Sequence, residues 1–231
     1  MIVKTRTPQI TVLLADDHTV VREGFRNMLE LEADIHVVGE AENGREAVAM
    51  VKKLKPAVVL MDIAMPLLNG LEATRQVVHD QPATKVVILP AHNDDAYVDE
   101  ATAAGARGFL IKQTSSHKLV EAIRAVHRGE TYLSESVSKR IRGRDIKEPC
   151  RHSSKKSGRA SLTSREIEIL QLIAEGKANK QTASELGIGI KTVEKHREHL
   201  MQKLDIHDTA GLTRYAISAG IIESSVQVTI I

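Results

Sequence analysis

The sequence predicts an α/β domain built on a parallel sheet, followed by a smaller all-α domain. Residues 9–129 alternate short, largely apolar runs with amphipathic helical segments. This alternation is typical of parallel strands that are buried on both faces and joined by crossover helices. Residues 160–231 carry helical patterns. Between the two, residues 130–159 are polar and basic and lack apolar periodicity, so we expect a flexible linker there.

Five apolar runs supply the strands of the first domain. They are ITVLLADD, IHVVGEA, AVVLMD, KVVILP and GFLIK, in chain order. Apolar residues at helical spacing follow the first run at Val21, Phe25 and Met28, a second helix is expected over about 44–54, and a last amphipathic segment ends at Gly129. Strand–helix units of this length predict an open sheet in the flavodoxin-like strand order 2-1-3-4-5, with helices on both faces.

Charged residues end three of these strands. The first strand ends in Asp16 and Asp17, the third in Asp62 and the fifth in Lys112. Since the first and third strands are neighbours at the switch point of this fold, three carboxylates would converge there beside a lysine. Such carboxylates repel one another unless a hard cation such as Mg²⁺ compensates them. With the cation bound, Asp62 can stay ionised and attack a phosphoryl group, whose charge Lys112 would neutralise.

Other interpretations of Asp62 fit the sequence less well. A lone aspartate at a strand end is more often a cap for the next turn, but four charged residues at matching strand ends favour chemistry. A dinucleotide site would need G-x-G-x-x-G after the first strand, where the chain reads ADDHTV. A phosphatase with an aspartyl nucleophile often carries a second aspartate two positions on, where this chain has Ala64. We therefore expect a phosphoacceptor and not an enzyme.

The composition of the chain excludes several classes of function. It contains no run of about 18 apolar residues, so we expect no membrane insertion, and its N-terminus lacks the apolar core of a secretion signal. The single cysteine, Cys150, rules out an internal disulfide and fits a reducing cytoplasm. The absence of Trp and an aromatic content of 2% argue against a stacking platform for single-stranded nucleic acid.

Basic residues gather in the expected linker. Residues 138–159 hold nine Lys or Arg against two Asp or Glu. This segment could add non-specific attraction to nucleic-acid phosphates. It could equally be a soluble tether, and the sequence does not separate the two interpretations.

One constellation in the first domain joins Asp16, Asp17, Asp62, the run MPLLNG and Lys112. It resembles the receiver domain of bacterial two-component response regulators. The resemblance implies that a sensor histidine kinase transfers a phosphoryl group from its phosphohistidine to Asp62. It also implies a Mg²⁺ ion held by Asp17, Asp62 and the backbone carbonyl of Ala64, with Asp16 nearby.

One position departs from the receiver pattern. In the family an aromatic residue on the fifth strand, here Phe109, moves together with a hydroxyl residue at the end of the fourth strand. That hydroxyl position is Pro90 in this chain, within the run VVILPAH. Proline offers a phosphoryl oxygen neither a hydroxyl nor an N–H, so the switch formed by Pro90, Phe109 and Lys112 is altered.

Four helical patterns make up the second domain. The first begins with a capping box, Thr163 followed by Glu166. Further helices are expected over about 179–186, 191–204 and 209–219, with a tight Gly-containing connection between the second and the third. This arrangement indicates a helix-turn-helix.

The third of these helices is the candidate for the DNA major groove. Val193 and Leu200 mark its apolar face. The opposite face carries polar side chains, namely Lys191, Glu194, Lys195, Glu198 and Gln202. Among them, Lys195 could address guanine, and Glu194 or Glu198 could accept from cytosine.

Three further residues suit contacts to the DNA phosphates: Lys180, Thr192 and Arg197. The same charges could instead form an ordinary solvated surface, because residues 160–231 hold eight basic and nine acidic residues. Net charge therefore does not by itself favour binding to DNA.

Almost the whole segment 162–222, which begins LTSREIEILQLIAEG, is closely similar to the LuxR-type helix-turn-helix, and TVEKHREHLMQKL is its most specific run. Together with the receiver resemblance, this identifies the chain as a member of the NarL/FixJ type of response regulators. The resemblance implies double-stranded DNA and RNA polymerase as partners and a homodimer in the active state. Dimerisation would use the last helix, which offers Leu212, Tyr215 and Ala216. Two departures are Thr182, where an aliphatic residue is usual, and Gly189, where Ser or Thr is the common cap.

These patterns support a cytoplasmic transcription regulator that is controlled by phosphorylation of Asp62. The alternative is a DNA-binding regulator that acts independently of phosphorylation and uses its receiver as a dimerisation module. Pro90 is the feature that favours the alternative, because it removes a contact on which the usual switch depends.

Overall fold

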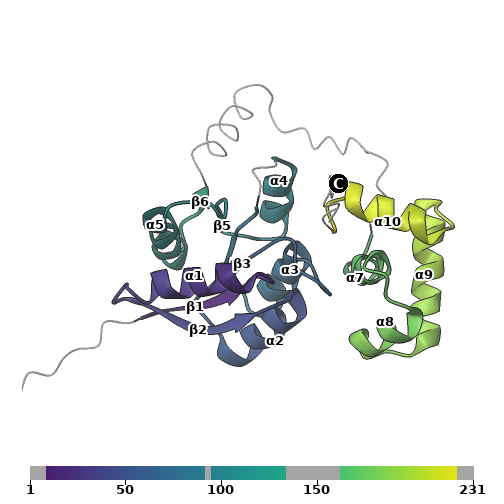
Figure 1. Ribbon diagram of the computed structural model, residues 1–231, viewed down its shortest axis with the longest axis horizontal. Coiled ribbons are helices and arrows are strands. Elements are labelled where there is room, and N and C mark those ends of the chain that lie inside the picture. Colours follow the sequence, from purple (N-terminus) through teal and green to yellow (C-terminus); the bar gives the residue numbers. More distant parts are fainter. Residues whose placement is uncertain (1–8, 92–94, 134–161, 223–231) are drawn as a thin grey trace, which may run out of the picture. The chain divides into compact units, whose positions relative to one another are not determined.

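The computed structural model describes residues 9–91, 95–133 and 162–222. The described residues form two compact units, an α/β unit and a helical unit (Figure 1). Most of the expected linker, residues 134–159, lies outside the described residues. None of the helices in the described part of the chain is both long enough and apolar enough to cross a membrane.

A six-stranded parallel sheet forms the centre of the α/β unit. Its strands are β1 (Ile10–Ala15), β2 (Ile35–Ala41), β3 (Val58–Met61), β4 (Lys85–Ile88), β5 (Gly108–Phe109) and β6 (Tyr132–Leu133). They are ordered β2-β1-β3-β4-β5-β6, which confirms the predicted order of the first five. The sequence does not predict the sixth strand, which pairs with β5 at the edge of the sheet and lies in the range assigned to the linker.

The pairing of β1 with β3 sets the position of two strand ends. Ala15 lies opposite Met61 in the register, so the residues immediately after them, Asp16 and Asp62, leave the sheet side by side. The backbone N–H of Asp62 donates to the Ala15 carbonyl at 2.8 Å, which extends the ladder by one residue. Every residue of β3 is buried, as its continuously apolar run predicts.

Helices cover both faces of this sheet. They are α1 (Thr19–Leu29), α2 (Gly44–Leu54), α3 (Gly70–Asp80), α4 (Asp95–Ala103) and α5 (Ser116–His127). On one face, Leu29 of α1 and Ile123 of α5 join a core with Leu60 of β3. On the other face, Met50 of α2 packs so closely on Gly39 of β2 that a Cβ there would meet its methyl group at 2.5 Å. Figure 1 shows α1 and α2 on opposite sides of the sheet, with α3 beside α2.

The helical unit contains α7 (Ser164–Ala174), α8 (Asn179–Leu186), α9 (Ile190–Leu204) and α10 (Thr209–Ser218). The predicted capping box is present at the start of α7. The Glu166 N–H donates to Thr163 Oγ1 at 3.3 Å, and the Thr163 N–H donates to Glu166 Oε2 at 2.9 Å. Gly187 ends α8 in the left-handed conformation (φ 62°), which only a glycine adopts at little cost, and the tight turn to α9 comes next.

The residues that the sequence offers for a dimer surface lie mostly on the inner face of α10. Leu212 and Ala216 are fully buried in the core of the helical unit, where they join Ile169 of α7 and Leu200 of α9. They are four residues apart, so they share the apolar face of α10, and that face packs inward. Tyr215 is partly buried against the same core. The exposed apolar side chain of α10 is Ile217, which sequence analysis did not single out.

Candidate functional site

The carboxyl ends of β1, β3 and β5 bring together three of the singled-out charged side chains. Lys112 Nζ lies 2.8 Å from Asp16 Oδ2 and 2.7 Å from Asp62 Oδ2. The backbone N–H of Lys112 donates to the Pro90 carbonyl at 2.9 Å, which ties the segment after β5 to the end of β4. The sheet order therefore places one ammonium between two carboxylates that are 46 residues apart in the chain.

The ionisation of Asp62 is governed by its burial, since its exposed fraction is only 2%. Burial is the main cause that raises the pKa of Asp62 to about 6, and the negative charges of Asp16 and Asp17 raise it further. The charge and the hydrogen bond of Lys112 lower this pKa and so limit the rise. Burial alone would lower the pKa of Lys112, but the charges and hydrogen bonds of Asp62 and Asp16 outweigh it and raise this pKa. Lys112 therefore stays charged, while Asp62 changes its protonation state just below neutral pH.

The loop after Asp62 folds back closely onto the strand end. Asp62 Oδ1 accepts the Ile63 N–H at 2.8 Å, and the Gly70 N–H donates to the Ile63 carbonyl at 2.8 Å. A Cβ at Gly70 would lie 1.7 Å from the Asp62 carbonyl oxygen, so only glycine fits at this position. Ala64 is partly buried within the same loop. The run MPLLNG thus shapes the backbone beside Asp62.

Four side chains at this edge of the sheet could hold a metal ion together. One ligand atom each from Asp16, Asp17, His18 and Asp62 lies within 4.8 Å of all the others. His18 Nδ1 is 2.8 Å from Asp17 Oδ1 and 3.1 Å from Asp16 Oδ1. Sequence analysis named the three carboxylates and missed His18, although it directly follows the acidic pair in the run ADDHTV.

Two of the predicted switch residues, Phe109 and Pro90, lie on β5 and just beyond the end of β4. Phe109 is 2% exposed and pairs with Ile88 in the ladder between β5 and β4. Pro90 is buried just beyond the end of β4, and its carbonyl accepts the Lys112 N–H. At this position the chain therefore supplies a backbone acceptor and no hydroxyl donor.

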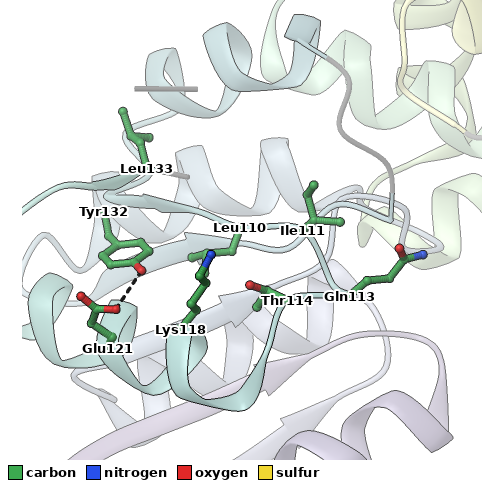
Figure 2. A pocket seen from close by; sticks show the side chains of 8 residues that line it. All are labelled: Leu110, Ile111, Gln113, Thr114, Lys118, Glu121, Tyr132 and Leu133. Carbon is green, nitrogen blue, oxygen red and sulfur yellow. Dashed lines mark hydrogen bonds between the residues drawn. The ribbon is translucent and has the colours of Figure 1, made fainter. Parts of the chain in front are cut away.

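A cavity in the α/β unit is lined in part by residues that flank Lys112 in the chain. It is a cavity of about 580 Å³ lined by Leu110, Ile111, Gln113, Thr114, Lys118, Glu121, Tyr132 and Leu133 (Figure 2). The Tyr132 hydroxyl donates to Glu121 Oε2 at 3.2 Å across one side of it. Sequence analysis did not predict this cavity, because β6, which forms one wall, leaves no recognisable pattern in the sequence.

The residues that the sequence singles out on α9 divide into a buried and an exposed face. Val193 and Leu200 are fully buried, and the expected polar residues are exposed: Lys191, Thr192, Glu194, Lys195, Glu198 and Gln202. Lys180 is likewise exposed near the start of α8. Gly189 is the N-cap of α9 and offers no side chain to cap it.

Arg197 differs from the other predicted DNA contacts. Its guanidinium donates to Asn179 Oδ1 at 3.2 Å and to Thr209 Oγ1 at 2.7 Å. These bonds connect α9 to the first residues of α8 and α10, so Arg197 holds three helices of the unit together. Thr182, the departure in α8, is 1% exposed, and its hydroxyl makes no hydrogen bond within the described residues.

Two family models match the chain. The model of the response regulator receiver domain matches residues 12–124, and the model of bacterial regulatory proteins of the luxR family matches residues 160–216. Between them they cover the two units that the structure describes.

Similar proteins extend over almost the whole chain. The transcriptional regulatory protein LiaR of Bacillus subtilis is 41% identical over 208 residues, which are 90% of this chain and 96% of LiaR. The oxygen regulatory protein NreC of Staphylococcus carnosus is 35% identical over 92% of this chain and 99% of NreC. A solved structure of the response regulator RcsB in complex with DNA is similar at 27% identity and a TM-score of 0.55, over 91% of this chain and 98% of that one. The chain therefore belongs to the NarL/FixJ type of two-component response regulators, DNA-binding transcription regulators that join a receiver domain to a LuxR-type helix-turn-helix.

Proposed function

We propose that this protein controls transcription through phosphorylation of Asp62 by a sensor histidine kinase. The observation that carries the proposal is the position of Lys112 Nζ, 2.7 Å from Asp62 and 2.8 Å from Asp16 at the ends of neighbouring strands. A buried carboxylate held beside a fixed ammonium is prepared to receive a dianionic group, because the ammonium pairs with the added charge.

In the proposed transfer, a carboxylate oxygen of Asp62 forms a bond to phosphorus as the P–N bond of the kinase's phosphohistidine breaks. The leaving imidazole keeps the electron pair and takes up a proton. Lys112 then pairs with the phosphoryl oxygens. Asp62 must be ionised to attack, and its pKa of about 6 leaves most of it ionised at neutral pH.

The donor set at this edge fits a hard divalent cation, and we propose Mg²⁺ with Asp17, Asp62 and the Ala64 carbonyl as ligands and Asp16 nearby. Carboxylate and carbonyl oxygens are the ligands that this ion takes, and the carboxylates of the cluster approach one another closely enough to share it. When bound, the cation would neutralise negative charge on the carboxylates and on the incoming phosphoryl group.

The proposed output is binding of double-stranded DNA through α9. Its exposed face carries Lys191, Glu194, Lys195 and Glu198 for base edges, with Thr192 and Lys180 placed for phosphates. The similarity to RcsB, which has been solved with DNA, supports this role. Arg197 would reach a phosphate only by giving up its bonds to α8 and α10, so we assign it first to holding these helices.

We further propose that the active form is a homodimer that recruits RNA polymerase in the cytoplasm. The receiver would span residues 9–129 together with β6, which pairs with β5 within the range first assigned to the linker. The basic linker would follow, and the DNA-binding domain would span residues 160–231. Since Leu212 and Ala216 are buried, a dimer contact through α10 would use its exposed face at Ile217, with Tyr215 at the margin.

The acceptor is tested by incubating the purified protein with Mg²⁺ and acetyl phosphate and measuring its intact mass. We expect one phosphoryl group on the wild type and none on Asp62→Asn. The matched control is Asp80→Asn, which alters a carboxylate at the end of α3 and should label like the wild type. Undiminished labelling of Asp62→Asn would refute the proposal.

One observation favours a second function, a regulator that binds DNA independently of phosphorylation. Pro90 is buried at the end of β4 and has neither a hydroxyl nor an N–H for a phosphoryl oxygen. In this alternative Asp62 would still accept a phosphoryl group, but DNA affinity would barely change. The two functions are therefore separated by the output and not by the labelling reaction.

A further inference from the structure

His18 lies on the exposed side of the acidic cluster, and neither the fold nor the proposed function has so far assigned it a role. Its Nδ1 atom lies 2.8 Å from Asp17 Oδ1 and 3.1 Å from Asp16 Oδ1. Lys112 occupies the inner side, at the Oδ2 atoms of Asp16 and Asp62. The side chains of His18 and Asp17 are 64% and 34% exposed, so the imidazole nitrogen and one carboxylate of the cluster can be reached from solvent.

We propose that His18 Nδ1 is a direct ligand of the divalent cation at this site, beside Asp17 and Asp62. The site would then bind a first-row transition-metal cation, of which Mn²⁺ is the probe, in preference to Mg²⁺. This inference rests on the part of the proposed function that places a cation among the carboxylates, and it adds a nitrogen ligand and a metal preference to it.

The preference arises from the chemistry of the two ligand types. Mg²⁺ takes oxygen ligands at about 2.0–2.1 Å and demands nearly octahedral geometry, so an imidazole adds little to its binding. Transition-metal cations accept imidazole together with carboxylates, and a nitrogen ligand strengthens their binding. Ligands on opposite sides of one ion at about 2.1 Å are roughly 4.2 Å apart. The four candidate ligand atoms, which all lie within 4.8 Å of one another, need only a small contraction to surround an ion.

The contacts that the His18 side chain makes are to the carboxylates of the cluster itself, at Asp16 and Asp17. It is the N-cap residue of α1, but its side chain makes no capping hydrogen bond. Its backbone N–H donates to Asp16 Oδ1 at 2.9 Å, and a substitution of the side chain keeps that bond. A loss of metal binding in His18→Ala would therefore report on the ligand and not on unfolding.

The test uses the full-length protein without any phosphodonor. Affinities for Mn²⁺ and Mg²⁺ are measured by competition, with free Mn²⁺ followed by electron paramagnetic resonance. Pulsed electron paramagnetic resonance of the Mn²⁺-loaded wild type detects directly the hyperfine coupling between Mn²⁺ and a coordinated imidazole nitrogen. The matched control is His79→Ala, because His79 is 87% exposed and its Nδ1 lies 2.9 Å from a single carboxylate oxygen of Asp80.

We expect the wild type to show nitrogen coupling and His18→Ala to lose it. The same variant should bind Mn²⁺ at least about tenfold more weakly, because even the loss of a contact that only supports a ligand costs about 10–100-fold in metal affinity. Its Mg²⁺ affinity should change by less than about threefold, because the oxygen ligands remain. His79→Ala should match the wild type in both measurements.

Absence of nitrogen coupling in the wild type would overturn the inference, and so would an equal loss of Mn²⁺ and Mg²⁺ affinity in His18→Ala. If the wild type binds Mg²⁺ and Asp17→Asn abolishes this binding while His18→Ala has no effect, the inference fails and the proposed Mg²⁺ site stands. If the wild type binds neither cation, both fail together.

Discussion

Asp62 is a carboxylate buried next to an ammonium and two other carboxylates, and its protonation is linked to folding. The pKa of Asp62 is raised from 3.8 to about 6 in the folded chain, mainly by burial, so the folded state binds this proton more tightly than the unfolded state does. Protonation of Asp62 therefore stabilises the folded state. This contribution to the free energy of unfolding is fully present below pH 3.8 and is lost as the pH rises through 6. Near neutral pH, the metal-free protein therefore has to hold an ionised, buried Asp62.

We expect Asp62→Asn to raise the free energy of unfolding of the metal-free protein at about pH 7.5, because the amide carries no charge to desolvate. The pKa rise from 3.8 to about 6 already includes the opposing effect of Lys112 and corresponds to roughly 3 kcal/mol, so we expect a gain of about 1–3 kcal/mol. Urea unfolding with a chelator present measures it. The gain should shrink at about pH 5, where the wild-type carboxyl is mostly protonated. An Asn variant that is less stable at the higher pH would contradict this.

Gly70 lies so close to the Asp62 backbone at the end of β3 that it has no room for a side chain. A Cβ at this position would lie 1.7 Å from the Asp62 carbonyl oxygen, so Gly70→Ala must displace the backbone. We expect a loss of about 3 kcal/mol or more in the free energy of unfolding, at the upper end of what overpacking costs. Gly24→Ala is the control, since no atom lies within 4 Å of a Cβ there and α1 should gain about 0.5–1 kcal/mol. Equal stability of the two variants would refute the argument.

At the scale of elements, the strands and helices that carry a repeating apolar pattern could be predicted from the sequence. β1 and β3 are continuous apolar runs, and the sheet order expected from alternating strands and helices brought Asp16, Asp62 and Lys112 together. β6 could not be predicted, because Tyr132 and Leu133 stand within a polar stretch and its place depends on the β5 edge it pairs with. Its pairing is a tertiary contact that no local pattern encodes.

In the helical unit, the partners of individual side chains also depend on tertiary contacts that the sequence does not reveal. The spacing of Leu212 and Ala216 predicts one apolar face, but the sequence does not tell whether that face packs inward or against a second copy, and the structure buries it. Arg197 has the charge and the exposed helix expected of a phosphate contact. Its hydrogen-bond partners, Asn179 and Thr209, lie on two other helices that only the folded unit brings near.

Exposed lysines on two helices of this unit should differ in what they contribute to DNA binding. We expect Lys195→Ala to change the sequence preference, at a cost of about 1–3 kcal/mol on the preferred site, if Lys195 reads a guanine from α9. Lys180→Ala should instead weaken binding to all sequences and flatten the salt dependence, because a phosphate contact carries no sequence information. Titrations on a panel of DNA sequences at several salt concentrations measure both. Identical, sequence-independent losses in the two variants would contradict this division.

At the scale of the whole molecule, the proposed function requires that a phosphoryl group on Asp62 change the affinity of α9 for DNA. A covalent group shifts a conformational equilibrium only through contacts that differ between the two states. The hydroxyl usual at the end of the fourth strand would be such a contact, and this chain has Pro90 there, buried and with its carbonyl engaged by the Lys112 N–H. Lys112 remains as a group that can pair with the phosphoryl oxygens, so one of the usual contacts is retained.

We expect DNA affinity to depend unusually little on phosphorylation, and Pro90→Thr to restore the dependence. A charge-assisted hydrogen bond contributes about 1.5–3 kcal/mol, which changes the ratio of active to inactive protein roughly ten- to a hundredfold. The measurement is DNA affinity with and without the phosphoryl mimic beryllofluoride, in the wild type and in Pro90→Thr. Pro90→Ala is the matched control, since it removes the ring without adding a hydroxyl, and it should leave the response small. A large response in the wild type that neither substitution changes would mean that Pro90 leaves the switch intact, and that Lys112 alone is sufficient to drive it.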